Sequence, residues 1–197
     1  LVTGTSVWEL FASSVMWGTR SLQLNRSFMS RIYVPRLIMP VASMAPAYLN
    51  LLISLAVLVL ATIYYRVTTG VNHLSLAQAG WSVLSVAMTA YLALGISLWT
   101  SVPALQARDV RFTLGYVLGF WVFLTPVLYP IRIPAPYEWL IALNPMAAIV
   151  NAFKYGLLDV DVLNVRDLGI AFLISTIVFV SGLWYFSRAE SDAADKA

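Results

Sequence analysis

The chain of 197 residues is strongly apolar: 60% of its residues are hydrophobic, 11% are charged, and the mean hydropathy is +0.81. Soluble domains carry about a quarter charged residues, so the composition excludes a soluble globular protein and indicates that lipid is its main solvent. The net charge of +3 lies in connecting segments rather than on one face, which argues against nucleic-acid binding. The absence of cysteine excludes disulfides and thiolate metal sites.

Segments without charged residues predict five membrane-spanning helices, because a helix needs about 20 apolar residues to cross the hydrocarbon. In chain order they are residues 1–19 (interrupted only by Glu9), 37–65, 81–99 within the uncharged stretch 67–107, 112–131 and 168–187. Pro40 and Pro46 fall in the first turns of the second span, where a missing N–H has little effect. Pro126 lies inside the fourth span and should kink it, which frees a carbonyl that protein or water must cover.

The region before the last span breaks this pattern. Residues 132–139 are Pro-rich and amphipathic, and residues 140–153 are apolar but too short to cross a bilayer. Asn144 followed by Pro145 is typical of a helix start, since Asn can cap and Pro loses nothing at the first helical position. We therefore expect re-entrant or interfacial outer helices here, followed by a last span that begins near Asp167, an acid favoured at a helix N-terminus.

The basic residues predict the orientation, because Lys and Arg are enriched on the cytoplasmic side. Segment 20–40 holds four arginines and no acid. With this segment inside, the inner connections hold eight Lys and Arg residues and the outer connections hold four. Residue 1 then lies outside, so we expect a single transmembrane domain over residues 1–197, truncated at its start, with a sixth span upstream.

Motifs for catalysis or for ion coupling are missing from the sequence, which has no GxxxxGK[ST], HExxH or GxSxG pattern. The single histidine, His73, is interpreted as a solvated residue of an outer turn with Gly70 and Asn72. Ion-coupled transporters bury ionisable residues within their spans, and here Glu9 is the only one. Beside Trp8 it favours an interfacial, snorkelling carboxylate over one at a pore entrance. The energy source is expected to lie outside this polypeptide.

Four motifs, in the right order, resemble those of the ABC-2 type permeases that export cell-surface polysaccharides such as O-antigen, teichoic acid and capsular polysaccharide. They are RIYVPRLIMP at residues 31–40, RDVR at 108–111, TPVLYP at 125–130 and LNPM at 143–146. The resemblance covers the chain from Trp8 to Arg188.

The resemblance implies an all-α, multi-pass permease of the bacterial inner (plasma) membrane that forms a homodimer and pairs with a separate ABC ATPase subunit. ATP and Mg²⁺ would be bound by that partner, with no cofactor in this chain. A lipid-linked polysaccharide would pass between the two permease copies.

The resemblance also implies roles for two segments: segment 20–40 would be a coupling helix on the ATPase, and region 131–166 would be an outer gate. The residues so assigned to ATPase coupling are Arg26, Arg31, Tyr33, Pro35, Arg36, Arg108, Asp109 and Arg111, and those assigned to the gate are Pro126, Tyr129, Pro130, Asn144 and Pro145. Cysteines introduced at Ala147 or Ala148 are expected to cross-link the gates of two copies.

Aromatic residues within the predicted spans are candidates for the substrate path, because an aromatic face can bury the apolar face of a sugar ring without fixed hydrogen bonds. They are Trp17, Tyr48, Tyr91, Tyr116, Trp121 and Phe123. Ordinary helix packing remains the default interpretation for any one of them. Likewise segment 20–40 could be only an orientation signal on anionic lipid, and residues 108–111 only a local ion pair.

Two other functions stay open: an ABC-2 permease for a drug or a small lipid, and a membrane-embedded glycan-modifying enzyme. The enzyme would need a catalytic histidine, carboxylate pair or nucleophile near an interface, and the sequence offers few such residues.

Overall fold

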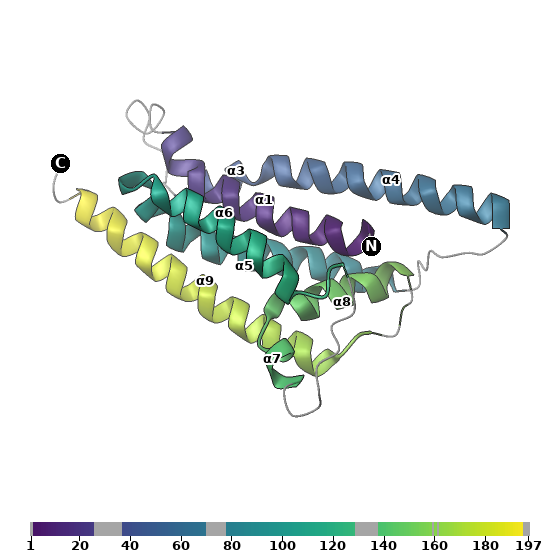
Figure 1. The fold of residues 1–197 in the computed structure, drawn as a ribbon. Helices are drawn as coiled ribbons and strands as arrows, with labels where there is room; N and C mark the ends of the chain where they lie inside the picture. The colour runs from purple at the N-terminus through teal and green to yellow at the C-terminus, as the bar shows by residue number, and fades with distance from the viewer. Residues whose placement is uncertain are drawn as a thin grey trace.

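The computed structural model describes residues 2–25, 37–69, 78–128, 138–158, 160 and 162–194, which form helices without any strand (Figure 1). The helices are α1 (Val2–Leu24), α3 (Ile38–Ser43), α4 (Ala45–Thr69), α5 (Ala79–Gln106), α6 (Asp109–Trp121), the 3₁₀ turn η1 (Val122–Leu124), α7 (Glu138–Ala142), α8 (Pro145–Leu158) and α9 (Val165–Ala194). The all-α fold class is confirmed. Segment 26–36, with the predicted coupling residues Arg26, Arg31, Tyr33, Pro35 and Arg36, lies outside the described residues, as do His73, Tyr129 and Pro130.

Helix α5 is the centre of the bundle and packs mainly against α1, α9 and α8. Small residues allow these close approaches, as is common between membrane helices. A Cβ at Gly95 would lie 2.9 Å from the backbone N and Cα of Phe179 in α9. Between α1 and α5, the hydroxyls of Thr19 and Thr100 are 2.6 Å apart and form a hydrogen bond. The sequence therefore builds its core from glycines and hydroxyls as much as from large apolar side chains.

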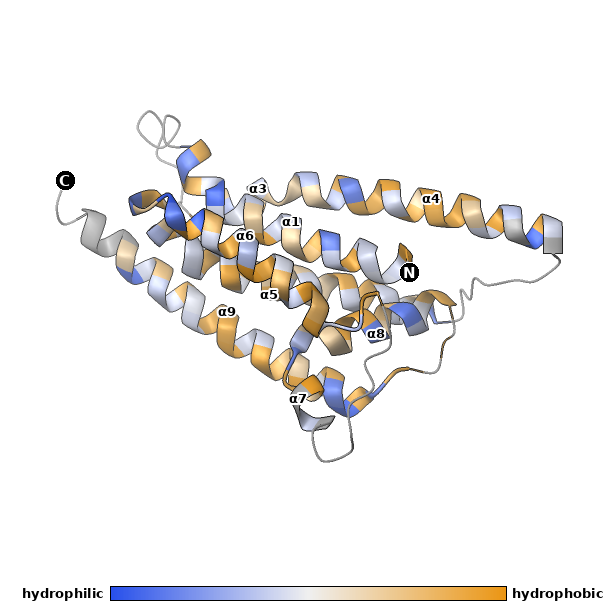
Figure 2. Cartoon of the chain, in the orientation of Figure 1, coloured by the Kyte–Doolittle hydropathy of each residue, from blue (hydrophilic) through white to orange (hydrophobic). Residues whose placement is uncertain are grey.

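Helix α4 packs on α1 at its start and then diverges from the bundle (Figure 1). It is apolar along most of its length (Figure 2), and many of its large apolar side chains are exposed. The single span predicted over residues 37–65 is divided into α3 and α4 by a turn at Met44. Pro40 and Pro46 lie in the first turns of these two helices, where their missing N–H groups are tolerated.

Three helical stretches are long and apolar enough to cross a membrane: Ile38–Thr68, Ala79–Gln106 and Val165–Ala189. Among the described residues these three stretches alone meet that length and composition, so the five predicted spans are not confirmed. Helix α1 carries Glu9 and Arg20 as well as many small polar residues. Helix α6 has 13 residues, which at 1.5 Å per residue reach about 20 Å, short of the roughly 30 Å hydrocarbon core.

The fourth predicted span, residues 112–131, is wrong as a continuous helix kinked at Pro126. Helix α6 ends at Trp121, η1 adds three residues, and a turn follows over residues 125–128. Thr125 has φ −110° and ψ 138°, the extended conformation that a residue before proline favours. Pro126 thus stands after the end of the helix rather than inside it, because the steric restriction on its predecessor stops the helix.

Two short helices before the last long one, α7 and α8, agree with the prediction for this region. Helix α8 begins at Pro145, and Asn144 Oδ1 accepts a hydrogen bond from the N–H of Met146 at 3.2 Å. The expectation that Ala147 or Ala148 could meet a second copy is wrong, since they are only 1% and 8% exposed. The residues of α8 are apolar on nearly every side, and such a helix is buried.

The helix ends form two groups, which we call the inner and outer ends after the predicted orientation. The inner end holds the C-terminal ends of α1, α5 and α9 and the start of α6; the outer end holds α7, α8 and the starts of α1 and α9 (Figure 1). Leu22, Leu98 and Phe186 form a buried cluster near the inner end. Arg20, Arg108, Arg111 and Arg188 all belong to inner-end segments, as the charge distribution predicts.

Candidate functional site

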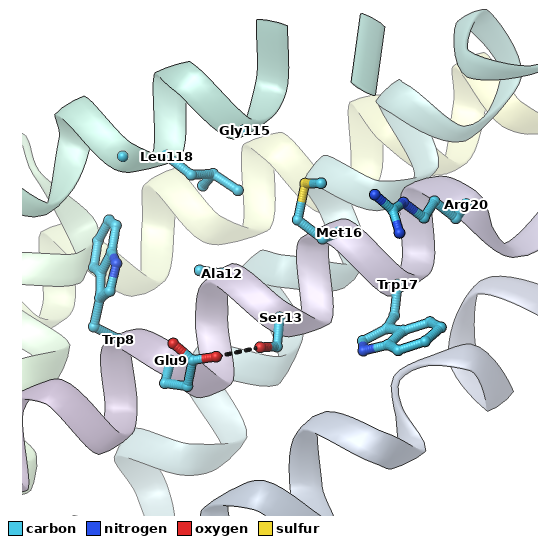
Figure 3. A pocket seen from close by; sticks show the side chains of 10 residues that line it. Trp8, Glu9, Ala12, Ser13, Met16, Trp17, Arg20, Gly115 and Leu118 are labelled. Atoms are coloured by element: carbon cyan, nitrogen blue, oxygen red, sulfur yellow. Dashed lines mark hydrogen bonds between the residues drawn. The ribbon is translucent and has the colours of Figure 1, made fainter. Parts of the chain in front are cut away.

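A groove of about 390 Å³ lies between α1 and α6 (Figure 3). Its lining from α1 is spaced at three- and four-residue intervals, so these side chains share one helix face. The lining residues are Trp8, Glu9, Ala12, Ser13, Met16, Trp17 and Arg20 of α1, with Gly115, Leu118 and Gly119 of α6.

The groove combines groups that suit a polyhydroxylated ligand. Glu9 accepts a hydrogen bond from Ser13 Oγ at 2.8 Å (Figure 3), and both side chains border the groove. Arg20 stands eleven residues further along α1, about 16 Å away at 1.5 Å per residue. A carboxylate and a guanidinium make strong hydrogen bonds to hydroxyls and anions, while Trp8 and Trp17 supply flat apolar surfaces.

The α6 side of the groove is formed by Gly115 and Gly119, with no heavy atom within 4 Å of where a Cβ would lie on either. Four residues apart, they lie on the same face of α6. Neither glycine was among the predicted site residues, although G-x-x-x-G in an apolar helix is a recognised signal of close helix contact. The G-x-x-x-G motif indicates that something packs closely on this face of α6, but it does not tell whether that is α1, lipid or another chain.

Behind the groove, three aromatic rings fix α1 to the end of α6. Trp121 packs edge-on against Phe11 with ring centroids 5.4 Å apart and against Trp8 at 6.3 Å, and Trp8 and Phe11 are themselves 5.4 Å apart. Trp121 also donates from Nε1 to Asn144 Oδ1 at 3.1 Å. This predicted path residue therefore connects α1, α6 and the start of α8.

The six predicted path aromatics do not share one groove within the chain. Trp17 lines the α1–α6 groove, whereas Tyr48 lines an apolar groove of about 320 Å³ between α4, α5 and α8. Tyr91 packs on Phe179 of α9 at 4.6 Å between ring centroids. Tyr116, Trp121 and Phe123 belong to α6 and η1, where Tyr116 and Phe123 are exposed.

Of the predicted gate residues, the structure brings Pro126, Asn144 and Pro145 together at the outer end of α6. Asn144 Nδ2 donates to the carbonyl of Leu124 and to Thr125 Oγ1, each at 3.0 Å. The start of α8 is thus attached to the turn that contains Pro126.

The predicted coupling residues that the structure describes, Arg108, Asp109 and Arg111, form the corner between α5 and α6. Arg108 and Asp109 are exposed, and the buried Nε of Arg111 has no acceptor among the described residues. No ion pair joins these three residues to one another or to other described residues. Within the described ranges, no group of three or more His, Cys, Asp or Glu residues could hold a metal ion.

These features define an all-helical membrane protein with a groove of mixed polar and aromatic character. No family model matches the sequence. Over 192 residues, 95% of the chain, it is 28% identical to an O-antigen export system permease protein RfbA of Klebsiella pneumoniae, and the alignment covers 71% of that protein. Over 158 residues, 78% of the chain, it is 27% identical to a protein of the same name from Myxococcus xanthus, covering 58% of that relative. The resemblance to polysaccharide-export permeases found in the motifs is confirmed.

Proposed function

We propose that the chain is the permease subunit of an ABC exporter that moves a lipid-linked polysaccharide across the bacterial inner membrane. The observation that carries the proposal is the similarity of 95% of the chain to O-antigen export permeases. The sequence contains no P-loop, so a separate ATPase subunit would bind ATP and Mg²⁺ and supply the energy.

The α1–α6 groove supports a glycan as the substrate class. Trp17 offers a face on which sugar rings can slide, and Glu9 and Ser13 offer hydrogen bonds that hydroxyl groups of many sugars satisfy. The position of Glu9 in the groove supports the interpretation of Glu9 as a carboxylate at a pore entrance rather than as an interfacial, snorkelling one. Sparse polar groups between apolar ones suit transport, because a polymer that binds too tightly at any point would not leave.

A second copy of the chain would complete the path. The face of α6 that carries Tyr116, Phe120 and the open glycines Gly115 and Gly119 is exposed in the single chain. A G-x-x-x-G face is suited to close approach by another helix. Two copies meeting near α6 would bring their grooves to face a shared space, which a single groove of about 390 Å³ could not provide for a polymer.

One observation favours the alternative of a drug or small-lipid permease. The groove lined by Tyr48 between α4, α5 and α8 exposes an almost wholly apolar surface, which suits an acyl chain better than a sugar. The two candidates differ in the groove they use, so variants can separate them.

The test is complementation of a bacterial strain that lacks its own O-antigen permease, with this chain and a candidate ATPase subunit from the same organism expressed together. We expect surface polysaccharide to return, and Glu9→Gln or Trp17→Ala to reduce it several-fold with membrane insertion unchanged. Trp184→Ala is the matched control, since Trp184 is exposed on α9 and outside the groove. Normal assembly with no polysaccharide export, or loss of export with Tyr48→Ala but not with Glu9→Gln or Trp17→Ala, would contradict the proposal.

A further inference from the structure

The turn that follows α6 is buried although its backbone carbonyls have lost their helical partners. Thr125 and Val127 are 0% and 1% exposed, and residues 125–128 form no helix. Buried carbonyls require donors, and in a membrane the requirement is stricter because hydrocarbon offers none. The donors that meet this requirement come from the start and the body of α8.

The first donor is Asn144, whose side chain uses its full hydrogen-bonding capacity here. Its Nδ2 donates to the Leu124 carbonyl and to Thr125 Oγ1, while its Oδ1 accepts from Trp121 Nε1 and from the N–H of Met146. Two donors and two acceptors on one short side chain are a property of Asn alone: Asp lacks the donors, and Gln is one methylene longer.

The second donor is Lys154, ten residues further along the chain. Its Nζ donates to the carbonyl of Pro126 at 2.5 Å and lies 3.5 Å from that of Val127. Burial lowers the pKa of the Lys154 ammonium. Gly4 of α1 packs directly against this hydrogen bond, since a Cβ on Gly4 would lie 2.7 Å from the Val127 carbonyl oxygen and 3.0 Å from Lys154 Cε.

Two attachments restrict motion in a way that one does not. A single bonded point at Asn144 would let α8 rotate about that point. Lys154, whose Cα lies about 15 Å further along α8 at 1.5 Å per residue, attaches the body of the helix to the next carbonyls of the same turn and opposes this rotation. The apolar side chains of α8 between them, such as Ile149 and Val150, are fully buried. The neighbouring α7, in contrast, exposes Trp139, and Leu143 just beyond its end is exposed as well.

We propose that Asn144 and Lys154 are positioning residues that lock α8 to segment 121–127, so that the end of α6 and α8 move as one body during transport. The transport part of this inference rests on the proposed function. Opening of the outer end then takes place at α7, or by movement of α6 that carries α8 with it.

The lock itself is tested on the purified chain, without transport. Because the chain has no cysteine, the single substitution Ala148→Cys places a reporter thiol on α8, and Ala104→Cys places one at the inner end of α5. We expect Lys154→Met to raise the rate at which a polar maleimide reacts with the α8 thiol at least tenfold. The α5 thiol should stay unreactive, and Lys154→Arg should keep the α8 thiol at its slow rate. No change at the α8 thiol, or an equal rise at both reporters, overturns the lock.

The one-body motion is tested in the complex with the ATPase, using Thr125→Cys with Asn144→Cys bridged by a short bis-methanethiosulfonate cross-linker, whose disulfide bonds to the two cysteines are broken by reduction. The bridged protein should export polysaccharide at the rate of the same protein after reduction. Export that stops on bridging and returns on reduction overturns the inference, because α8 must then leave the turn. Absence of export by the unsubstituted chain in the same complex speaks against the proposed function instead, and the thiol reactivities still decide whether the lock holds.

Discussion

Among single residues, Lys154 is the side chain whose role the sequence conceals most. In sequence it counts as one of four basic residues of the outer connections, yet in the structure it is half-buried on the carbonyls of Pro126 and Val127. Its charge is opposed there by backbone oxygens rather than by a carboxylate of the described residues. Hydrogen bonds that involve a charged group are stronger than neutral ones, so this attachment should contribute measurably to stability.

Lys154→Met should lower the free energy of unfolding by about 1–3 kcal/mol, since two buried carbonyls lose their donor. The measurement is the thermal midpoint in detergent, followed by tryptophan fluorescence.

The pH dependence of this stability difference has a definite sign. Burial lowers the pKa of Lys154 below 10.5 in the folded state, so the unfolded chain binds more protons between the two pKa values, and stability rises with pH there. The wild type should therefore gain stability over Lys154→Met as the pH approaches 10.5; a gap that narrows instead contradicts this assignment.

Among the helices, the position of α5 depends on glycines at its contact with α9. Gly95 faces the backbone of Phe179, and a Cβ on Gly182 would lie 2.6 Å from the carbonyl oxygen of Gly95. Backbone atoms cannot move aside as a flexible side chain can. Gly169 on α9 provides a contrast within the same chain, because no heavy atom lies within 4 Å of where its Cβ would lie.

Gly95→Ala should destabilise the chain by about 1–3 kcal/mol through overpacking, whereas Gly169→Ala should leave the free energy of unfolding unchanged or slightly higher. Thermal midpoints of the two variants, compared in one detergent, test this difference. Equal midpoints for both would mean that α5 and α9 can separate without loss.

The outer helices also carry a prediction. Because Ala147 and Ala148 are buried, the residue suited to bridging two copies is Leu143, which is 52% exposed next to α7. If α7 is the moving part of the gate, Leu143→Cys bridged between two copies should stop polysaccharide export, and reduction should restore it. Export at the normal rate with the bridge complete would show that α7 does not close the path.

Over the molecule as a whole, the charge distribution and the fold agree. The inner end carries Arg20, Arg108, Arg111 and Arg188, and blue, hydrophilic residues gather at the start of α6 (Figure 2). The buried Nε of Arg111 has no acceptor among the described residues. A partner that offers carboxylates to this end could pair with the exposed guanidinium of Arg108, which suits the ATPase of the proposed exporter.

Charge reversal at Arg108 should leave insertion intact and abolish substrate-stimulated ATP hydrolysis by the partner, since it sets like charges against each other at the contact. Arg31→Glu and Arg36→Glu are expected to act in the same way. The measurement is ATPase activity of the reconstituted complex, with the permease alone as the blank. If these residues serve only lipid anchoring, the variants will show reduced expression but normal coupling in the protein that inserts.

The membrane environment of this protein, its all-helical class and the positions of most of its helices along the chain could be predicted from the sequence. Runs without charge locate α4, α5 and α9, and the Asn144–Pro145 pair locates the start of α8, because capping and proline geometry act within a few residues. The four motifs point to the family that the relatives support. These features are local, so a sequence can reveal them.

Which of these local features come together depended on the tertiary structure. Pro126 follows the end of a helix rather than bending one, and the donors for the carbonyls of Leu124 and Pro126 lie about 20 to 30 residues away, at Asn144 and Lys154. The groove joins Glu9 and Gly119, which are more than a hundred residues apart in the sequence. Ala148 is buried although it belongs to a helix predicted to lie at the outer surface. In an apolar chain nearly every helix face can face lipid or protein, and composition cannot distinguish these two environments; only the packing of distant segments does.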